Sequence, residues 1–187
     1  MNQRKPIACM GTLALLLAGF LAAPSSMKAA KAPDAPDSEQ VSKLLSEART
    51  TAYQLREDAV TMESFTRMNV SWESHANAIT QVKEHVNALG RQAAKLKDAR
   101  AAASPWQKTA IDRIEPFLDE LGGYTSAVIE HINQNPKRLF TDEYKDYLEA
   151  NADYASDLSA MIGDFVNYGR AKQRMEHFTE KLEIPGR

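Results

Sequence analysis

Cysteine is almost absent from this sequence, since Cys9 is the only one among 187 residues. A single cysteine can form neither an internal disulfide nor a site with several thiolate ligands, such as a zinc finger or a c-type haem attachment. Cys9 also stands at the start of an apolar run rather than directly after it, which disfavours acylation as in a lipoprotein. The folded chain must therefore depend on side-chain packing for its stability.

Glycine and proline are also scarce, at 8 residues each. Because both residues punctuate secondary structure, their scarcity favours a few long elements over many short strands. The length allows one domain with a sizeable core, and a hydrophobic fraction of 43% is ordinary for a soluble globular protein. We therefore predict an all-α fold.

The first residues differ in character from the rest of the chain. Arg4 and Lys5 precede an uninterrupted run of 17 apolar or small residues, 7–23, and no acidic residue appears before Asp34. This pattern is typical of a secretory signal peptide. A retained membrane anchor is the alternative, because the run is close to the shortest that spans a bilayer.

We predict a signal peptide at residues 1–25, cleaved between positions 23 and 30, and a periplasmic or secreted location without a stable membrane span. Residues 26–37 combine proline, alanine and small polar residues without an apolar period, which predicts a flexible linker. Removing residues 1–25 leaves 21 basic and 25 acidic side chains. This mildly acidic balance disfavours nucleic acid as a partner.

Residues 38–187 contain four stretches in which apolar residues recur every three or four positions, which predicts amphipathic helices. Their periodic residues run from Val41 to Phe65, from Trp72 to Leu96, from Trp106 to Ile132 and from Tyr144 through Tyr168 and Met175 to Leu182. Connections of a few residues force neighbouring helices to run antiparallel. We therefore expect an elongated antiparallel four-helix bundle.

Polar residues before each stretch predict where the helices begin, because their side chains can accept hydrogen bonds from first-turn amides. The candidate caps are Asp37 or Ser38, Asn69 or Ser71, Ser104 followed by Pro105, and Thr141. Two interruptions are expected inside the helices. The third should bend between Pro116 and Gly122–Gly123, and the fourth should stop or bend at Gly163 or Gly169.

Histidines are the candidates for a metal or haem site. His177 and Glu180 are three positions apart, so both could face one metal ion from the same side of a helix. His75 lies within a buried stripe, where a hydrogen-bonded interior histidine is the simpler interpretation. Haem would need a methionine, such as Met62 or Met68, opposite a histidine. We predict no cofactor, with a haem- or metal-carrying bundle as the alternative.

Acidic residues recur at helical spacing in the fourth stretch, and they predict either a solvated face or a docking strip for a basic partner. The strip comprises Asp146, Glu149, Asp153 and Asp157. The sequence contains no Gly-x-Ser-x-Gly elbow, phosphate-binding glycine loop or zinc-protease motif, so we do not predict an enzyme. The expected function is a non-catalytic protein-interaction, scaffolding or chaperone-like module, which binds another protein or itself.

Overall fold

The computed structural model describes residues 35–183. The predicted signal peptide and the linker up to residue 34 lie outside this range. All regular structure in the described range is helical, which confirms the all-α prediction. The elements are α1 (Glu39–Ser64), η1 (Phe65–Arg67), α2 (Trp72–Ala99), η2 (Arg100–Ala102), α3 (Pro105–Gln134) and α4 (Asp142–Lys181), where η denotes a short 3-10 segment.

Each α-helix begins directly after a serine or threonine. The Ser38 hydroxyl accepts a hydrogen bond from the Val41 amide, and the Ser71 hydroxyl accepts one from the Ser74 amide. Ser104 and Thr141 precede α3 and α4. The Ser38 and Ser71 hydroxyls thus replace helical partners that first-turn amides lack, whereas the Thr141 hydroxyl donates instead to the Arg138 carbonyl. At each predicted capping site, one candidate residue occupies the N-cap position.

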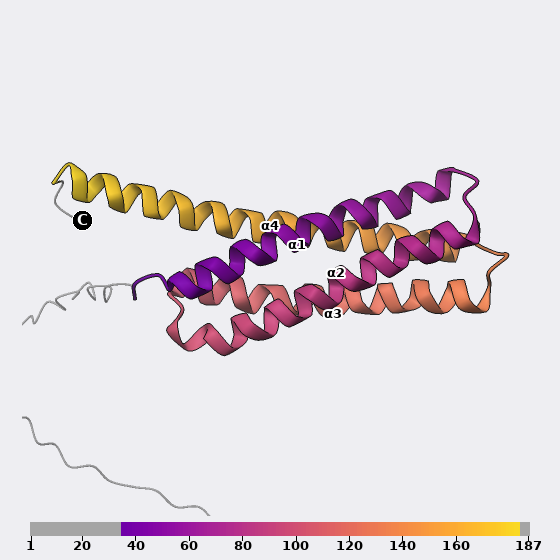
Figure 1. The fold of residues 1–187 in the computed structure, drawn as a ribbon, viewed down its shortest axis with the longest axis horizontal. Helices are drawn as coiled ribbons and strands as arrows, with labels where there is room; N and C mark the ends of the chain where they lie inside the picture. Colours follow the sequence, from indigo (N-terminus) through magenta and orange to yellow (C-terminus); the bar gives the residue numbers. More distant parts are fainter. Residues whose placement is uncertain (1–34, 184–187) are drawn as a thin grey trace, which may run out of the picture. The chain divides into compact units, whose positions relative to one another are not determined.

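The four helices pack against one another in a closed order. α1 contacts α2 and α4, and α3 also contacts α2 and α4, so each helix has two principal neighbours. Consecutive helices run in opposite directions, as Figure 1 shows. Among the described helices, none combines the length and the hydrophobicity needed to cross a membrane.

The buried face of α1 is the predicted apolar stripe. All seven residues of that stripe are buried, from Val41 near the start of the helix to Met62 near its end. Similar stripes on the other helices complete one core, whose largest side chains are Tyr144, Leu45, Leu55, Met62, Leu89, Leu96, Ile114, Leu121, Leu148, Leu158 and Ile162. Burial of apolar surface on this scale is the main source of folding free energy.

Neither α3 nor α4 is divided at the positions where an interruption was predicted. α3 continues through Pro116, which is exposed, and through Gly122–Gly123. α4 continues through both Gly163 and Gly169, so the expectation of a stop there was wrong. None of these glycines has a positive φ angle, which means that the backbone uses them as ordinary helical residues.

A buried glutamine joins the starts of α1 and α3. The Gln107 side-chain oxygen accepts hydrogen bonds from the amides of Ser38 and Ser104, at 2.9 and 3.0 Å. Its side-chain nitrogen donates to the Ser38 carbonyl and to the Ser42 hydroxyl, at 2.9 and 3.0 Å. All four hydrogen-bonding positions of a primary amide are used. Gln107 therefore fixes two helix ends against each other, and every polar atom of its own side-chain amide is paired.

Candidate protein-interaction surface

α4 is much longer than the helices that cover it. It has 40 residues, whereas α3, the next longest, has 30. At about 1.5 Å per residue, α4 is longer by roughly 15 Å. Its last buried residue is Val166, and Figure 1 shows its end, in yellow, continuing past the start of α1. We call residues 173–183 the overhang.

Large apolar side chains on this part of α4 face solvent. Tyr168, Met175, Phe178 and Leu182 are 54%, 66%, 52% and 63% exposed. The prediction that Tyr168, Met175 and Leu182 continue the buried stripe was therefore wrong. For Met175 and Leu182 the physical reason is that α1 begins at Glu39 and α3 at Pro105, so neither helix runs beside the overhang. Tyr168 lies before the overhang and contacts Trp106, but 54% of its surface stays exposed.

These residues continue a line of apolar side chains that starts within the bundle. Met161, Tyr168, Met175 and Leu182 are spaced by seven, which places them on one face of a helix that can pair with another. Phe165 and Phe178 widen this line. We call these six residues the α4 stripe.

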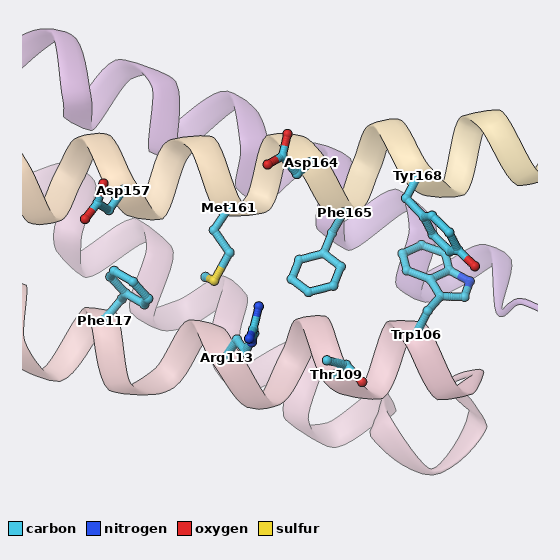
Figure 2. A pocket seen from close by; sticks show the side chains of 9 residues that line it. All are labelled: Trp106, Thr109, Arg113, Phe117, Asp157, Met161, Asp164, Phe165 and Tyr168. Carbon is cyan, nitrogen blue, oxygen red and sulfur yellow. The ribbon is translucent and has the colours of Figure 1, made fainter.

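The first part of the α4 stripe lies in an open groove between α3 and α4. Met161 and Phe165 point from α4 towards α3, and Arg113 rises between the two helices (Figure 2). The groove has a volume of about 820 Å³. Its lining comprises Trp106, Thr109, Arg113, Phe117, Asp157, Met161, Asp164, Phe165 and Tyr168.

Trp106 closes one end of this groove and is held on several sides. Its indole nitrogen donates a hydrogen bond of 2.7 Å to Asp37 Oδ1, and its ring meets the Tyr168 ring edge to face at 5.5 Å. The ring also lies over Gly169, where a Cβ atom would be only 2.7 Å from Trp106 Cη2. Gly169 is therefore required for the close approach of the indole to α4.

Asp37 is the last residue before the cap of α1, and it also binds α4. Lys172 Nζ donates to the same Asp37 oxygen at 2.9 Å. Partial burial opposes ionisation of this carboxyl group, but the hydrogen bonds from Lys172 and Trp106 and the charge of Lys172 outweigh it, so the pKa of Asp37 is lowered. Asp37 and Lys172 thus form a half-buried ion pair beside the groove.

One flank of the α4 stripe carries opposite charges beside the groove and on the overhang. Beside the groove, Asp157 and Asp164 are exposed, and neither forms an ion pair with a residue in the range 35–183. On the same side of the overhang lie Arg174 and Lys181, which are likewise unpaired within the described part of the chain. This flank of α4 therefore changes from acidic beside the groove to basic on the overhang.

The predicted acidic strip is at the surface. Asp146, Glu149, Asp153 and Asp157 are all exposed on α4. Its last member, Asp157, also lines the groove, so the strip reaches the α4 stripe. Whether the strip binds a basic partner stays a prediction.

The predicted metal pair lies on the overhang. His177 and Glu180 are exposed, and His177 faces a shallow hollow with Arg170, Arg174 and Phe178. Across residues 35–183, no three histidine, cysteine, aspartate or glutamate side chains are close enough to hold one metal ion. A metal bound by His177 and Glu180 would therefore need further ligands from elsewhere, and the site stays a prediction.

His75 belongs to a buried cluster at the other end of the bundle. A hydrogen bond of 2.8 Å joins its Nδ1 to the Tyr144 hydroxyl, and the Tyr144 ring stacks on His131 at 4.8 Å. His131 Nε2 donates to the Arg138 carbonyl at 3.1 Å. Burial lowers the pKa of His75 and raises that of Tyr144. The sequence located His75 in the core but gave no sign of its partners.

Sequence reasoning missed the groove residues Trp106, Arg113 and Phe117 as a group. No sequence pattern groups these three residues. The seven-residue spacing from Met161 to Leu182 indicates one side of α4 only. Comparisons with protein-family models, with curated proteins and with solved structures gave no match to this chain. Its function is therefore inferred from the surface described above.

Proposed function

We propose that this chain is an exported helical module that binds protein through the α4 stripe and the groove beside it, without catalysis. The observation that carries this proposal is the exposure of Tyr168, Met175, Phe178 and Leu182 along one line. Contiguous apolar surface on a monomer is usually small, because its contact with water is unfavourable. A partner that covers this line would remove that cost.

The residue types support a protein partner. Methionine and aromatic side chains are enriched at the centres of protein interfaces, and methionine adapts its shape to different partners. Five of the six residues of the α4 stripe belong to these types. The groove is also open to solvent rather than enclosed, which suits a helix or an extended segment better than a small molecule.

The finer features of the proposal are the compartment and the shape. We propose an elongated antiparallel bundle that follows a cleaved signal peptide and a linker, in the periplasm or outside the cell. The charged start, the apolar run and the absence of acidic residues before Asp34 support export. Mass spectrometry of the protein from the extracytoplasmic fraction should show a chain that begins after residue 23. A chain that retains residues 1–23 would contradict cleavage.

A capture experiment tests the proposed surface. The tagged protein is cross-linked in its native compartment, and its partners are compared with those of the triple variant Tyr168→Glu, Met175→Glu, Phe178→Glu. Tyr53→Glu is the matched control, because Tyr53 is also 54% exposed but lies on α1. Partners should be retained by the control and lost by the triple variant. Equal capture by all three proteins would refute the assigned surface.

The alternative function, a bundle that carries haem or a metal ion, has a separate test. In the structure a hydrogen bond joins His75 Nδ1 to the Tyr144 hydroxyl, and His131 Nε2 donates a hydrogen bond to the Arg138 carbonyl, so neither nitrogen is free to bind a metal. A Soret band or a stoichiometric metal in the protein from its native compartment would establish the alternative.

A further inference from the structure

We propose that the partner of the α4 stripe is a second copy of this chain, with the two α4 helices antiparallel and the overhang of each copy lying in the α3–α4 groove of the other. This inference rests on the proposed function, and it names the partner of that same surface. It follows from the shape, the register and the charge of α4.

The shape of α4 provides both halves of such a contact. The overhang projects as a single helix, and the groove is a hollow between two helices. Both lie on the same face of α4, on either side of Tyr168. A twofold axis through Tyr168 therefore places the projection of each copy against the hollow of the other. This arrangement uses the same patch twice and closes after two copies.

The spacing of the α4 stripe fits that axis. Residues at equal distances before and after Tyr168 meet across an antiparallel pair. Met175 then lies opposite Met161 of the second copy, because both are seven residues from Tyr168. Phe178 lies further along the overhang, beyond the positions that meet Phe165 and Met161 of the second copy. Apolar side chains therefore meet over about three helical turns in each half of the contact.

Charges on one flank are complementary in this arrangement. A twofold axis across two antiparallel helices brings each flank of one helix against the same flank of the other. Arg174 and Lys181 share a flank with Asp157 and Asp164, as the heptad positions show. Lys181 lies opposite position 155 of the second copy, two residues from Asp157. Arg174 lies opposite position 162, two residues from Asp164.

The other flank is complementary as well. Glu176 and Glu183 lie on the side of the overhang that faces α3 of the second copy. Arg113 rises from α3 beside Met161 (Figure 2), and Met161 is opposite Met175 of the second copy. Glu176, which also forms an ion pair of 3.4 Å with Lys172 of its own chain, therefore comes beside Arg113 of the second copy. The Arg113 guanidinium has no ion-pair partner within residues 35–183. In a parallel pair, the basic flank of one overhang would lie against the acidic flank of the other. The α3–α4 grooves would then stay empty, so the antiparallel pair covers more of the α4 stripe.

Two charge-reversed variants test the pairing. The overhang variant is Arg174→Glu with Lys181→Glu, and the groove variant is Asp157→Lys with Asp164→Lys. Each variant places like charges across both halves of its own dimer, so its dissociation constant should rise at least tenfold in sedimentation experiments. A mixture of the two variants restores opposite charges in both halves, so a heterodimer should form with nearly the original affinity. Failure of the mixture to pair would refute the register.

A cross-link gives an independent measurement. The described residues contain no cysteine, so Tyr168→Cys, in a Cys9→Ser background, places one thiol on the proposed axis. Mild oxidation should link two copies through residue 168. Gln173→Cys is the control, because position 173 lies on another side of α4, and it should cross-link far less. Circular dichroism checks that all variants keep their helix content.

The outcomes separate the inference from the proposed function. A dimer that dissociates with charge reversal and cross-links at position 168 supports the inference. A monomer at all concentrations refutes it, and the capture experiment then decides whether the α4 stripe binds a different protein. Binding of a monomer to vesicles that contain anionic lipid would also refute it and would identify the overhang as a membrane-surface helix.

Discussion

Replacing Gly169 by alanine should destabilise the protein relative to the same replacement at Gly163. At Gly169 the new Cβ atom would lie 2.7 Å from Trp106 Cη2 and 3.0 Å from Cζ2. At Gly163, in the same helix, the new atom would meet nothing within 4 Å. The pair therefore differs mainly in the contact with the indole ring.

The magnitude follows from two opposing effects. Alanine stabilises a helix interior by about 1 kcal/mol relative to glycine, and this gain applies at both positions. At Gly169 overpacking opposes it by about 1–3 kcal/mol, because the indole is held by Asp37 and Tyr168 and cannot move freely. We expect Gly163→Ala to raise the free energy of unfolding by about 1 kcal/mol. The free energy of unfolding of Gly169→Ala should be lower than that of Gly163→Ala by about 1–3 kcal/mol.

Urea unfolding monitored by circular dichroism measures both free energies. Tryptophan fluorescence gives a second readout, because Gly169→Ala should also alter the environment of Trp106, whereas Gly163→Ala should leave it unchanged. Equal stabilisation by the two replacements would show that Trp106 does not lie over Gly169.

Three further predictions concern buried groups. Gln107→Leu should destabilise by about 2–4 kcal/mol in urea unfolding, because it leaves the amides at two helix starts without an acceptor; an unchanged midpoint would contradict the hydrogen bonds. Burial lowers the pKa of His75, so the unfolded chain binds a proton more readily than the folded one. The His75 contribution to the unfolding free energy should be constant above about pH 6.5 and decrease below it. The decrease in unfolding free energy between about pH 7 and 5 should therefore be smaller in His75→Gln than in the unchanged protein. Leu55→Ala and Leu89→Ala should each cost about 2–5 kcal/mol, since both side chains are buried; a change near zero would show that the core is misassigned.

The sequence was sufficient to predict the helices and most of the core. In α1 the apolar residues return every three or four positions from Val41 to Met62, and a helix can bury such a set only on one face. Ser104 followed by Pro105 identified the start of α3, because a capping hydroxyl and a fixed proline φ angle both favour that position. These are local properties, so the residues themselves determine them.

The candidate surface could not be predicted in the same way. Met175 and Leu182 continue the period of α4, and periodicity does not indicate whether another helix lies alongside. That depends on where α1 and α3 begin in space. Gln107 shows the same limit: its place three residues after Ser104 indicates a capping box, but its bonds to Ser38 and Ser42 join segments at least 65 residues apart.

The ion pair between Asp37 and Lys172 has a consequence for the order in which the molecule assembles. Its two groups are separated by 135 residues, so the pair can close only after nearly the whole polypeptide has been released. During synthesis α2 is available as a neighbour of α1 long before α4 is. Until α4 is complete, the side of α1 that packs against it stays exposed to water, so the four-helix core can close only late.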